Sequence, residues 1–118
     1  ALETVRRVQG TLLTIASDHG QQVVRDSEIL YIEVQGHNLI YHTLHGDLTA
    51  TGTLKQIEAQ LKPSGFYRCN YCYLVNLRHV GFLDGSEVTV GQYKLQISRN
   101  RRKEFLQQLT QFYGRGGR

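Results

Sequence analysis

The chain has 118 residues, of which 40% are hydrophobic and 20% are charged, and its net charge is +4 at neutral pH. This length is typical of one domain with one hydrophobic core, and the composition excludes a disordered chain. No membrane-spanning run and no signal peptide are found, and two cysteines are too few for a disulfide scaffold, so we expect a cytoplasmic protein.

The positive charge is concentrated at the C-terminal end. Residues 99–118 contain six basic residues and one acidic residue, which gives +5, whereas residues 1–98 carry −1. A basic region at one end of a chain favours a polyanionic partner such as nucleic acid. A solvated basic helix has the same composition, so charge alone leaves both interpretations open.

Short segments rich in β-branched and aromatic residues follow one another in the first half of the chain, which predicts a series of hairpins. The predicted strands cover 11–16, 21–25, 29–34, 38–44 and 47–51. The residues between them include Gly, Asp and Ser, which favour turns. In residues 38–44, apolar side chains occur at both odd-numbered and even-numbered positions, so both faces of the strand are partly apolar. This is typical of a strand covered on both faces.

A short helix is predicted over residues 53–61. Thr53 and Gln56 have the spacing of a capping box, the apolar residues recur at helical spacing, and Pro63 prevents continuation. Strands are expected again at 66–69, 74–84, 87–91 and 93–98, and a C-terminal helix capped by Ser98 is expected within 98–114.

This order of elements does not fit alternating βα units, because strands precede and follow the short helix in groups. It predicts a mostly β fold: an elongated antiparallel β sandwich of small sheets, with the short helix between layers and a C-terminal helix. The expected organisation is a linker remnant at 1–9, a folded domain at 10–113 and a disordered tail at 114–118.

Cys69 and Cys72 have a spacing that is known from zinc sites and redox dithiols. Zinc would need two further ligands, and His42 and His45 are three residues apart on a predicted strand, where their side chains point to opposite faces. We therefore expect two buried or half-buried thiols and no metal site, and a zinc- or thiol-based sensor is the alternative function. No catalytic or cofactor-binding motif is found, so neither an enzyme nor a cofactor is expected.

Three polar turns are candidates for contact with nucleic acid. They are the segment 35–38 with its imidazole and amide groups, the Asn70-Tyr71 pair, and the segment 98–100 that leads into the basic cluster. Side chains of these types reach base edges or phosphates. Turns are also polar because they are solvated, so each turn taken separately is a weak signal.

Five motifs follow one another along the chain: a strand that ends in an acidic residue, a helix that opens with Thr-Leu, an aromatic residue two positions before an arginine, a Val-Asn pair, and a Ser-Arg followed by basic residues. They are Ile29 to Glu33, Thr53-Leu54, Phe66 with Arg68, Val75-Asn76 and Ser98-Arg99. In this order and spacing, over about residues 5–110, the motifs resemble the LytTR family of DNA-binding domains.

The resemblance implies that loops of an antiparallel β sandwich enter successive major grooves of a bent DNA duplex. Transferred position by position, the DNA contacts are His37, Asn38, Asn70, Tyr71 and Arg99. Arg68 and Asn76 are expected to be scaffold residues that fix the loop carrying Asn70 and Tyr71 and do not read bases. The family commonly has His where this chain has Asn70, and a polar residue and Ser where it has Tyr71 and Cys72.

The phosphate contacts are expected from the basic cluster of Arg101, Arg102 and Lys103, with Arg78 as a candidate addition. The resemblance also implies a bacterial transcriptional response regulator whose receiver domain precedes the DNA-binding domain. Its partner would be double-stranded DNA at promoter direct repeats. The isolated domain would be a monomer that dimerises on DNA or through the receiver domain, and no membrane is involved.

Overall fold

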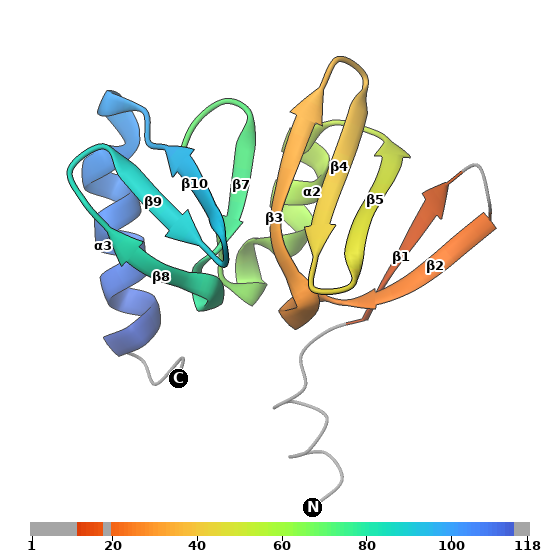
Figure 1. The fold of residues 1–118 in the computed structure, drawn as a ribbon, viewed down its shortest axis with the longest axis horizontal. Coiled ribbons are helices and arrows are strands. Elements are labelled where there is room, and N and C mark those ends of the chain that lie inside the picture. The colour runs from red at the N-terminus through yellow and green to blue at the C-terminus, as the bar shows by residue number, and fades with distance from the viewer. Residues whose placement is uncertain (1–11, 18–19, 115–118) are drawn as a thin grey trace, which may run out of the picture.

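The computed structural model describes residues 12–17 and 20–114, in which ten strands form three antiparallel sheets accompanied by two α-helices (Figure 1). A two-stranded sheet pairs β1 (Leu12–Ser17) with β2 (Gly20–Arg25). The expected linker remnant at 1–9 lies outside the described residues, as do residues 115–118 of the expected tail, whereas Gly114 is the last residue of the second helix.

A five-stranded sheet occupies the centre of the molecule, in the order β5-β4-β3-β7-β6. Its strands are β3 (Ile29–Gln35), β4 (Asn38–Thr43), β5 (Gly46–Thr51), β6 (Phe66–Arg68) and β7 (Tyr73–Asn76). A three-stranded sheet in the order β10-β9-β8 lies beside it (Figure 1). It is built from β8 (Val80–Leu83), β9 (Glu87–Val90) and β10 (Tyr93–Gln96). The predicted antiparallel β fold of small sheets is confirmed.

The central sheet is covered on both faces, because successive side chains along a strand point to opposite sides. Ile32 and its cross-strand partner Leu74 pack with β1, β2 and the helix at 54–61. On the other face, Tyr31 and its partner Val75 pack with the β8–β10 sheet and the C-terminal helix at 102–114. The molecule therefore has two hydrophobic clusters, one on each face of the five-stranded sheet. Of residues 38–44, Leu39 and Tyr41 belong to the first cluster, whereas Leu44, in the other alternating set, is exposed.

The helix α2 (Leu54–Leu61) forms as predicted. The Thr53 hydroxyl accepts a hydrogen bond from the backbone N–H of Gln56 at 3.2 Å, which satisfies one of the free donors at the start of the helix. A 3-10 turn, η2 (Lys62–Ser64), contains Pro63 and ends the helix. None of the helices in residues 12–17 and 20–114 has the length and apolar character needed to span a membrane.

The predicted single strand over 74–84 is wrong. A 3-10 turn, η3 (Leu77–His79), separates β7 from β8, and the two strands belong to different sheets. The side chain of Asn76 accepts a hydrogen bond from the backbone N–H of Arg78 at 3.1 Å and so caps this turn. The chain leaves the central sheet here and enters the smaller one.

The predicted side-chain cap at Ser98 is also wrong. Ser98 precedes the 3-10 turn η4 (Arg99–Arg101), and its side chain makes no capping hydrogen bond, whereas its carbonyl accepts from the N–H of Arg101 at 3.0 Å. The helix α3 (Arg102–Gly114) follows. Phe105 is fully buried, and the other two members of the predicted apolar stripe, Leu109 and Phe112, pack against the same cluster.

Candidate nucleic-acid interface

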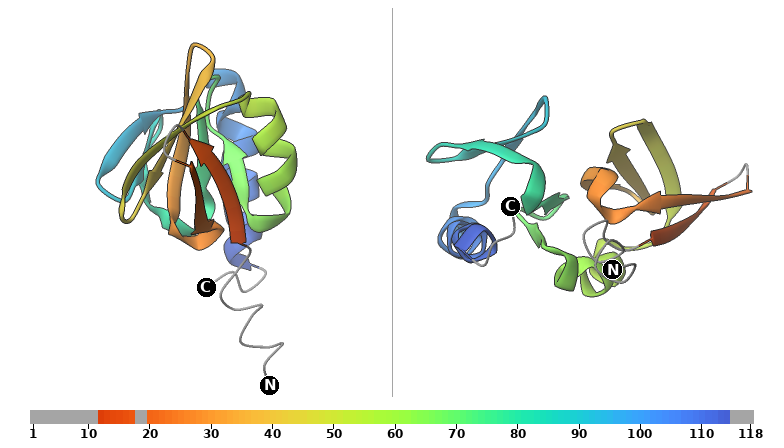
Figure 2. Two further views of the ribbon diagram at one scale, coloured as in Figure 1. Left: turned by 90° about the vertical axis from the view of Figure 1, so that its right-hand side faces the viewer. Right: turned by 90° about the horizontal axis from the view of Figure 1, so that it is seen from below.

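Three connections between elements lie at the same end of the molecule in two perpendicular views (Figures 1 and 2). They are the β3–β4 turn at 36–37, the β6–β7 loop at 69–72 and the β10–α3 connector at 97–101. We call this surface the connector end. It contains the three polar turns that the sequence analysis singled out, brought together from positions far apart in the chain.

Main-chain hydrogen bonds join the three connections in order. The N–H of Val34, beside the β3–β4 turn, donates to the carbonyl of Cys72 in the β6–β7 loop at 3.0 Å. The N–H of Ser98, in the β10–α3 connector, donates to the carbonyl of Cys69 at the other end of that loop at 2.8 Å. The relative positions of the connections are therefore fixed largely by backbone atoms.

The β3–β4 turn has two residues, because Gln35 pairs with Asn38. Gly36 has a φ of +61°, and no residue other than glycine has positive φ in the described part of the chain, so the turn has a left-handed residue only at its first position. This is the pattern of a type II′ hairpin turn. It leaves the side chains of His37 and Asn38 exposed.

The β6–β7 loop is braced by the side chain of Asn70. Its Nδ2 donates to the carbonyl of Gln96 on β10 at 2.6 Å, and its Oδ1 accepts from the N–H of Cys72 at 2.7 Å. Tyr71, at the tip, is 80% exposed. The amide of Asn70 thus holds the loop, and the Tyr71 ring is the part of it that projects into solvent.

The β10–α3 connector and the first turn of α3 carry the basic cluster. Arg99, Arg102 and Lys103 are exposed, and Arg101 is half-buried. Positive charges in the first turn of a helix oppose its dipole, so Arg102 and Lys103 do not serve helix stability. A cluster of exposed cations favours an anion such as phosphate.

Arg78 does not belong to the connector end. It lies on η3, which packs beside η1 (Asp26–Glu28) through a hydrogen bond from Asn76 Nδ2 to the carbonyl of Asp26 at 3.1 Å. Because η1 precedes β3 and the β3–β4 turn follows it, η1 and η3 lie at the opposite end of the strand. Arg78 therefore lies away from the other candidate phosphate-contacting residues, Arg101, Arg102 and Lys103.

Arg68 and Asn76 are scaffold residues. Arg68 Nε lies 3.1 Å from Glu58 Oε1 and so connects β6 to α2. Asn76 is 1% exposed and also donates to the carbonyl of Ile29 at 2.8 Å. It therefore fixes the start of β3 rather than the β6–β7 loop.

Two cysteines differ in their environments. Cys69 is buried, its Sγ lies 3.5 Å from the carbonyl of Gln96, and burial raises the pKa of its thiol to about 12. Cys72 is exposed, so the expectation that both thiols are buried or half-buried is wrong for this residue. Residues 12–17 and 20–114 contain no group of three or more His, Cys, Asp or Glu side chains suited to a metal ion, and nothing supports a zinc or thiol sensor.

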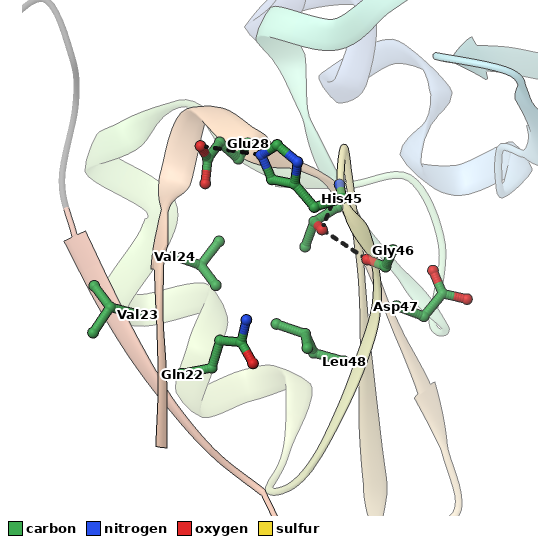
Figure 3. Close-up of a pocket in the computed structure, with 9 residues that line it drawn as sticks. Gln22, Val23, Val24, Glu28, His45, Gly46, Asp47 and Leu48 are labelled. Carbon is green, nitrogen blue, oxygen red and sulfur yellow. Dashed lines mark hydrogen bonds and ion pairs between the residues drawn. The ribbon is translucent and has the colours of Figure 1, made fainter. Parts of the chain in front are cut away.

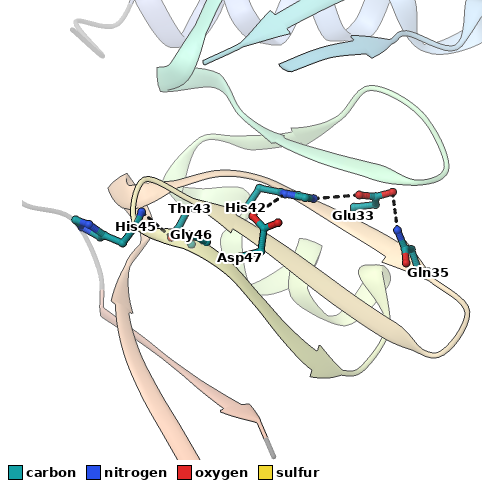
Figure 4. Close-up of polar contacts among 7 residues, drawn as sticks. All are labelled: Glu33, Gln35, His42, Thr43, His45, Gly46 and Asp47. Carbon is teal, nitrogen blue, oxygen red and sulfur yellow. Dashed lines mark hydrogen bonds and ion pairs between the residues drawn. The ribbon is translucent and has the colours of Figure 1, made fainter. Parts of the chain in front are cut away.

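The histidines of β4 and the β4–β5 turn diverge as expected. His42 is buried, whereas His45 is exposed and lies 3.4 Å from Glu28. Glu33 and Asp47 match none of the motifs described above, but they flank His42 on neighbouring strands (Figure 4). Only the pairing of β3, β4 and β5 brings these three side chains together, so no local pattern reveals the group.

A small pocket lies between β2 and the β4–β5 turn (Figure 3). Val23, Val24 and Leu48 form its apolar part, and the ion pair of Glu28 with His45 lies at its edge. The β4–β5 turn is at the opposite end of β4 from the β3–β4 turn, so this pocket is not part of the connector end.

Comparisons with known proteins identify the family. The family model of the LytTr DNA-binding domain matches residues 20–110. Among solved structures, the chain is similar to a LytTr DNA-binding domain from Bacillus cereus, named as part of a methyl-accepting/DNA response regulator. The TM-score is 0.70 at 19% sequence identity, with 84% of this chain and 95% of that chain covered, which shows a common fold. A comparison with curated protein sequences gave no match. Because the family model matches most of the chain, the protein belongs to the LytTr family of DNA-binding domains.

Proposed function

We propose that the connector end binds double-stranded DNA and reads its sequence, with residues 10–113 as the DNA-binding unit. The observation that carries this proposal is the alignment of three exposed polar connections on one end of a rigid β scaffold (Figure 1). The described residues extend over 43 Å along their longest axis, which exceeds the about 34 Å of one helical turn of DNA. The molecule as a whole is therefore long enough to lie along one turn of a duplex, and we propose that the three connections enter successive major grooves on one side of it.

The affinity comes mainly from phosphate contacts. Arg101, Arg102 and Lys103 neutralise phosphates and release condensed counterions, so the logarithm of the binding constant falls linearly with the logarithm of the salt concentration. With about three such contacts, the expected slope on B-form DNA is roughly −3 per domain. Contacts of this kind position the protein on the duplex and carry no direct information about sequence.

The sequence is read by side chains at the three connections. The planar guanidinium of Arg99 suits the paired acceptors O6 and N7 of guanine in the major groove. His37 and Asn38 offer ring and amide groups to base edges from the β3–β4 turn. In the β6–β7 loop, Tyr71 contacts the bases, and Asn70 contributes chiefly by holding the loop to the carbonyl of Gln96.

We further propose that the protein is the effector domain of a bacterial transcriptional response regulator that acts in the cytoplasm. The Bacillus cereus domain of the same fold is named as part of a response regulator. Two copies would occupy direct repeats in a promoter, each with its connector end toward a bent duplex. Dimerisation would then occur on DNA or through a receiver domain.

Selection of bound duplexes from a random pool tests sequence-specific binding directly. An enriched motif with guanine at a conserved position is the expected result, and Arg99→Ala should then weaken binding to the selected duplex by about 1–3 kcal/mol and relax the preference at that position. Lys103→Ala is the matched control, since it removes one positive charge nearby and should weaken binding to all sequences similarly.

Two results would contradict the proposal. Recovery of a pool with no enriched motif would leave only general DNA affinity. Equal binding of the selected duplex by wild type and Arg99→Ala would show that the β10–α3 connector does not read bases.

A further inference from the structure

His42 lies between two carboxylates on one face of the central sheet. On β5, Asp47 is its direct cross-strand partner, and His42 Nδ1 lies 3.0 Å from Asp47 Oδ1. On β3, Glu33 is its diagonal neighbour, and His42 Nε2 lies 3.0 Å from Glu33 Oε1. The ring also stacks on its other cross-strand partner, Tyr31, with ring centroids 4.2 Å apart and planes inclined by 17°. We call Glu33, His42 and Asp47 the His42 bridge (Figure 4).

Both ring nitrogens of His42 lie within hydrogen-bond distance of a carboxylate oxygen. A neutral imidazole has one N–H and donates to one carboxylate only, whereas the imidazolium form donates to both. Hydrogen bonds between charged partners are stronger than neutral ones, and this ring is shielded from water because its side chain is only 10% exposed. The bridge therefore ties three adjacent strands together through side chains.

The bridge extends to the β3–β4 turn. The second carboxylate oxygen of Glu33, Oε2, accepts a hydrogen bond from Gln35 Nε2 at 3.2 Å, and Gln35 is the residue before Gly36 (Figure 4). The pairing of β3 with β7 ends at Glu33, so the last two residues of β3, Val34 and Gln35, have no partner on β7. On the side of β3 that faces β7, they are held by the hydrogen bond from the N–H of Val34 to the carbonyl of Cys72. The continuous series of side-chain contacts from Asp47 through His42 and Glu33 to Gln35 supports the β3–β4 turn where it leaves β3.

We propose that the His42 bridge is a positioning device for DNA recognition: it holds the β3–β4 turn in the orientation in which His37 contacts DNA. The inference rests on the proposed function. Asp47, Glu33 and His42 act through the turn and do not themselves touch DNA. Asp47 is at the start of β5, at the far end of the hairpin from His37, so its replacement tests this indirect action cleanly.

The sign of the effect separates positioning from simple electrostatics. Removing an acidic residue makes the protein more positive, and general electrostatics then predicts equal or slightly tighter binding to DNA. The His42 bridge predicts the opposite for Asp47→Ala, because one of the two acceptors of the ring is lost. We expect about three- to tenfold weaker binding to the selected duplex, in the range of indirect effects transmitted through packed elements.

Two variants serve as matched controls. Asp47→Asn removes the charge but keeps an oxygen acceptor beside His42 Nδ1, so its affinity should lie within about twofold of wild type. Glu87→Gln on β9 removes the same charge outside the bridge and should bind equally well or slightly more tightly. Asp47 has a side chain that is 54% exposed, so these replacements leave the core intact. Denaturant unfolding of each variant verifies that it is folded under the binding conditions.

The decisive measurement combines Asp47→Ala with His37→Ala in the 118-residue chain. If the bridge acts through the β3–β4 turn, Asp47→Ala weakens binding in the wild-type background and has no further effect once His37 is replaced. Equal or tighter binding by Asp47→Ala, or the same loss in both backgrounds, overturns the inference while the proposed function stands. If the wild-type chain and Glu87→Gln select no duplex, the proposed function itself fails, and the inference fails with it.

Discussion

Asn76→Ala is expected to destabilise the protein by about 3 kcal/mol. The side chain is 1% exposed and makes three hydrogen bonds: Nδ2 donates to the carbonyls of Asp26 at 3.1 Å and Ile29 at 2.8 Å, and Oδ1 accepts from the N–H of Arg78 at 3.1 Å. Each bond contributes about 1 kcal/mol net, and more where a buried main-chain group is left without a partner. A loss of this size is a large share of the about 5–15 kcal/mol by which domains are stable.

The measurement is urea unfolding at neutral pH, followed by circular dichroism, with linear extrapolation to water. Asn76→Asp sharpens the test, because it keeps the acceptor for Arg78 but places a carboxylate against two carbonyl oxygens. Its loss should be at least as large as that of the alanine variant. Gln107→Ala, at an exposed position of α3, is the control and should change stability by less than about 0.5 kcal/mol. A loss below about 1 kcal/mol for Asn76→Ala would refute the role of this side chain as the tie between η3 and the start of β3.

Three further predictions concern thiols and packing. Burial raises the pKa of Cys69 to about 12, so this thiol stays protonated at pH 8 and should resist alkylation in the folded protein. Exposed Cys72 should react. Mass spectrometry after iodoacetamide treatment distinguishes the expected single adduct from two adducts. Gly65→Ala should destabilise by about 1–3 kcal/mol, because φ is +91° and a Cβ would lie 2.6 Å from the Phe112 ring; an unchanged melting temperature would contradict this close approach. Phe105→Ala should cost about 3–5 kcal/mol, since its ring is fully buried between α3 and the β8–β10 sheet, and thermal unfolding monitors the loss.

Local sequence patterns were sufficient to predict most helices and strands, because these elements are determined largely by neighbouring residues in the sequence. Thr53 caps α2 and Pro63 ends it, as their types and spacing indicate. The strand over 74–84 was predicted as continuous because its apolar pattern is continuous. The interruption arises from the side-chain amide of Asn76, which donates hydrogen bonds to the carbonyls of Asp26 and Ile29. These partners are distant in the sequence, so no local pattern reveals them.

The sequence was sufficient to predict that the candidate interface consists of polar turns. The turn residue Gly36 and the basic residues near Arg99 indicate two of these turns directly. The uses of individual side chains were not predictable. Asn70 offers the same amide whether it reads a base or braces a loop, and only the position of Gln96 on β10 shows the bracing role. Arg78 belongs to the same chemical class as Arg99, and the path of the chain through η3 separates them.

The hydrogen bonds that align the β3–β4 turn, the β6–β7 loop and the β10–α3 connector join N–H and carbonyl groups, which every residue except proline supplies. Tip residues such as His37 and Tyr71 are therefore replaceable without moving the frame that presents them. If the connector end reads DNA as we propose, new operator preferences can arise, in evolution or by design, through one or two substitutions while folding is maintained.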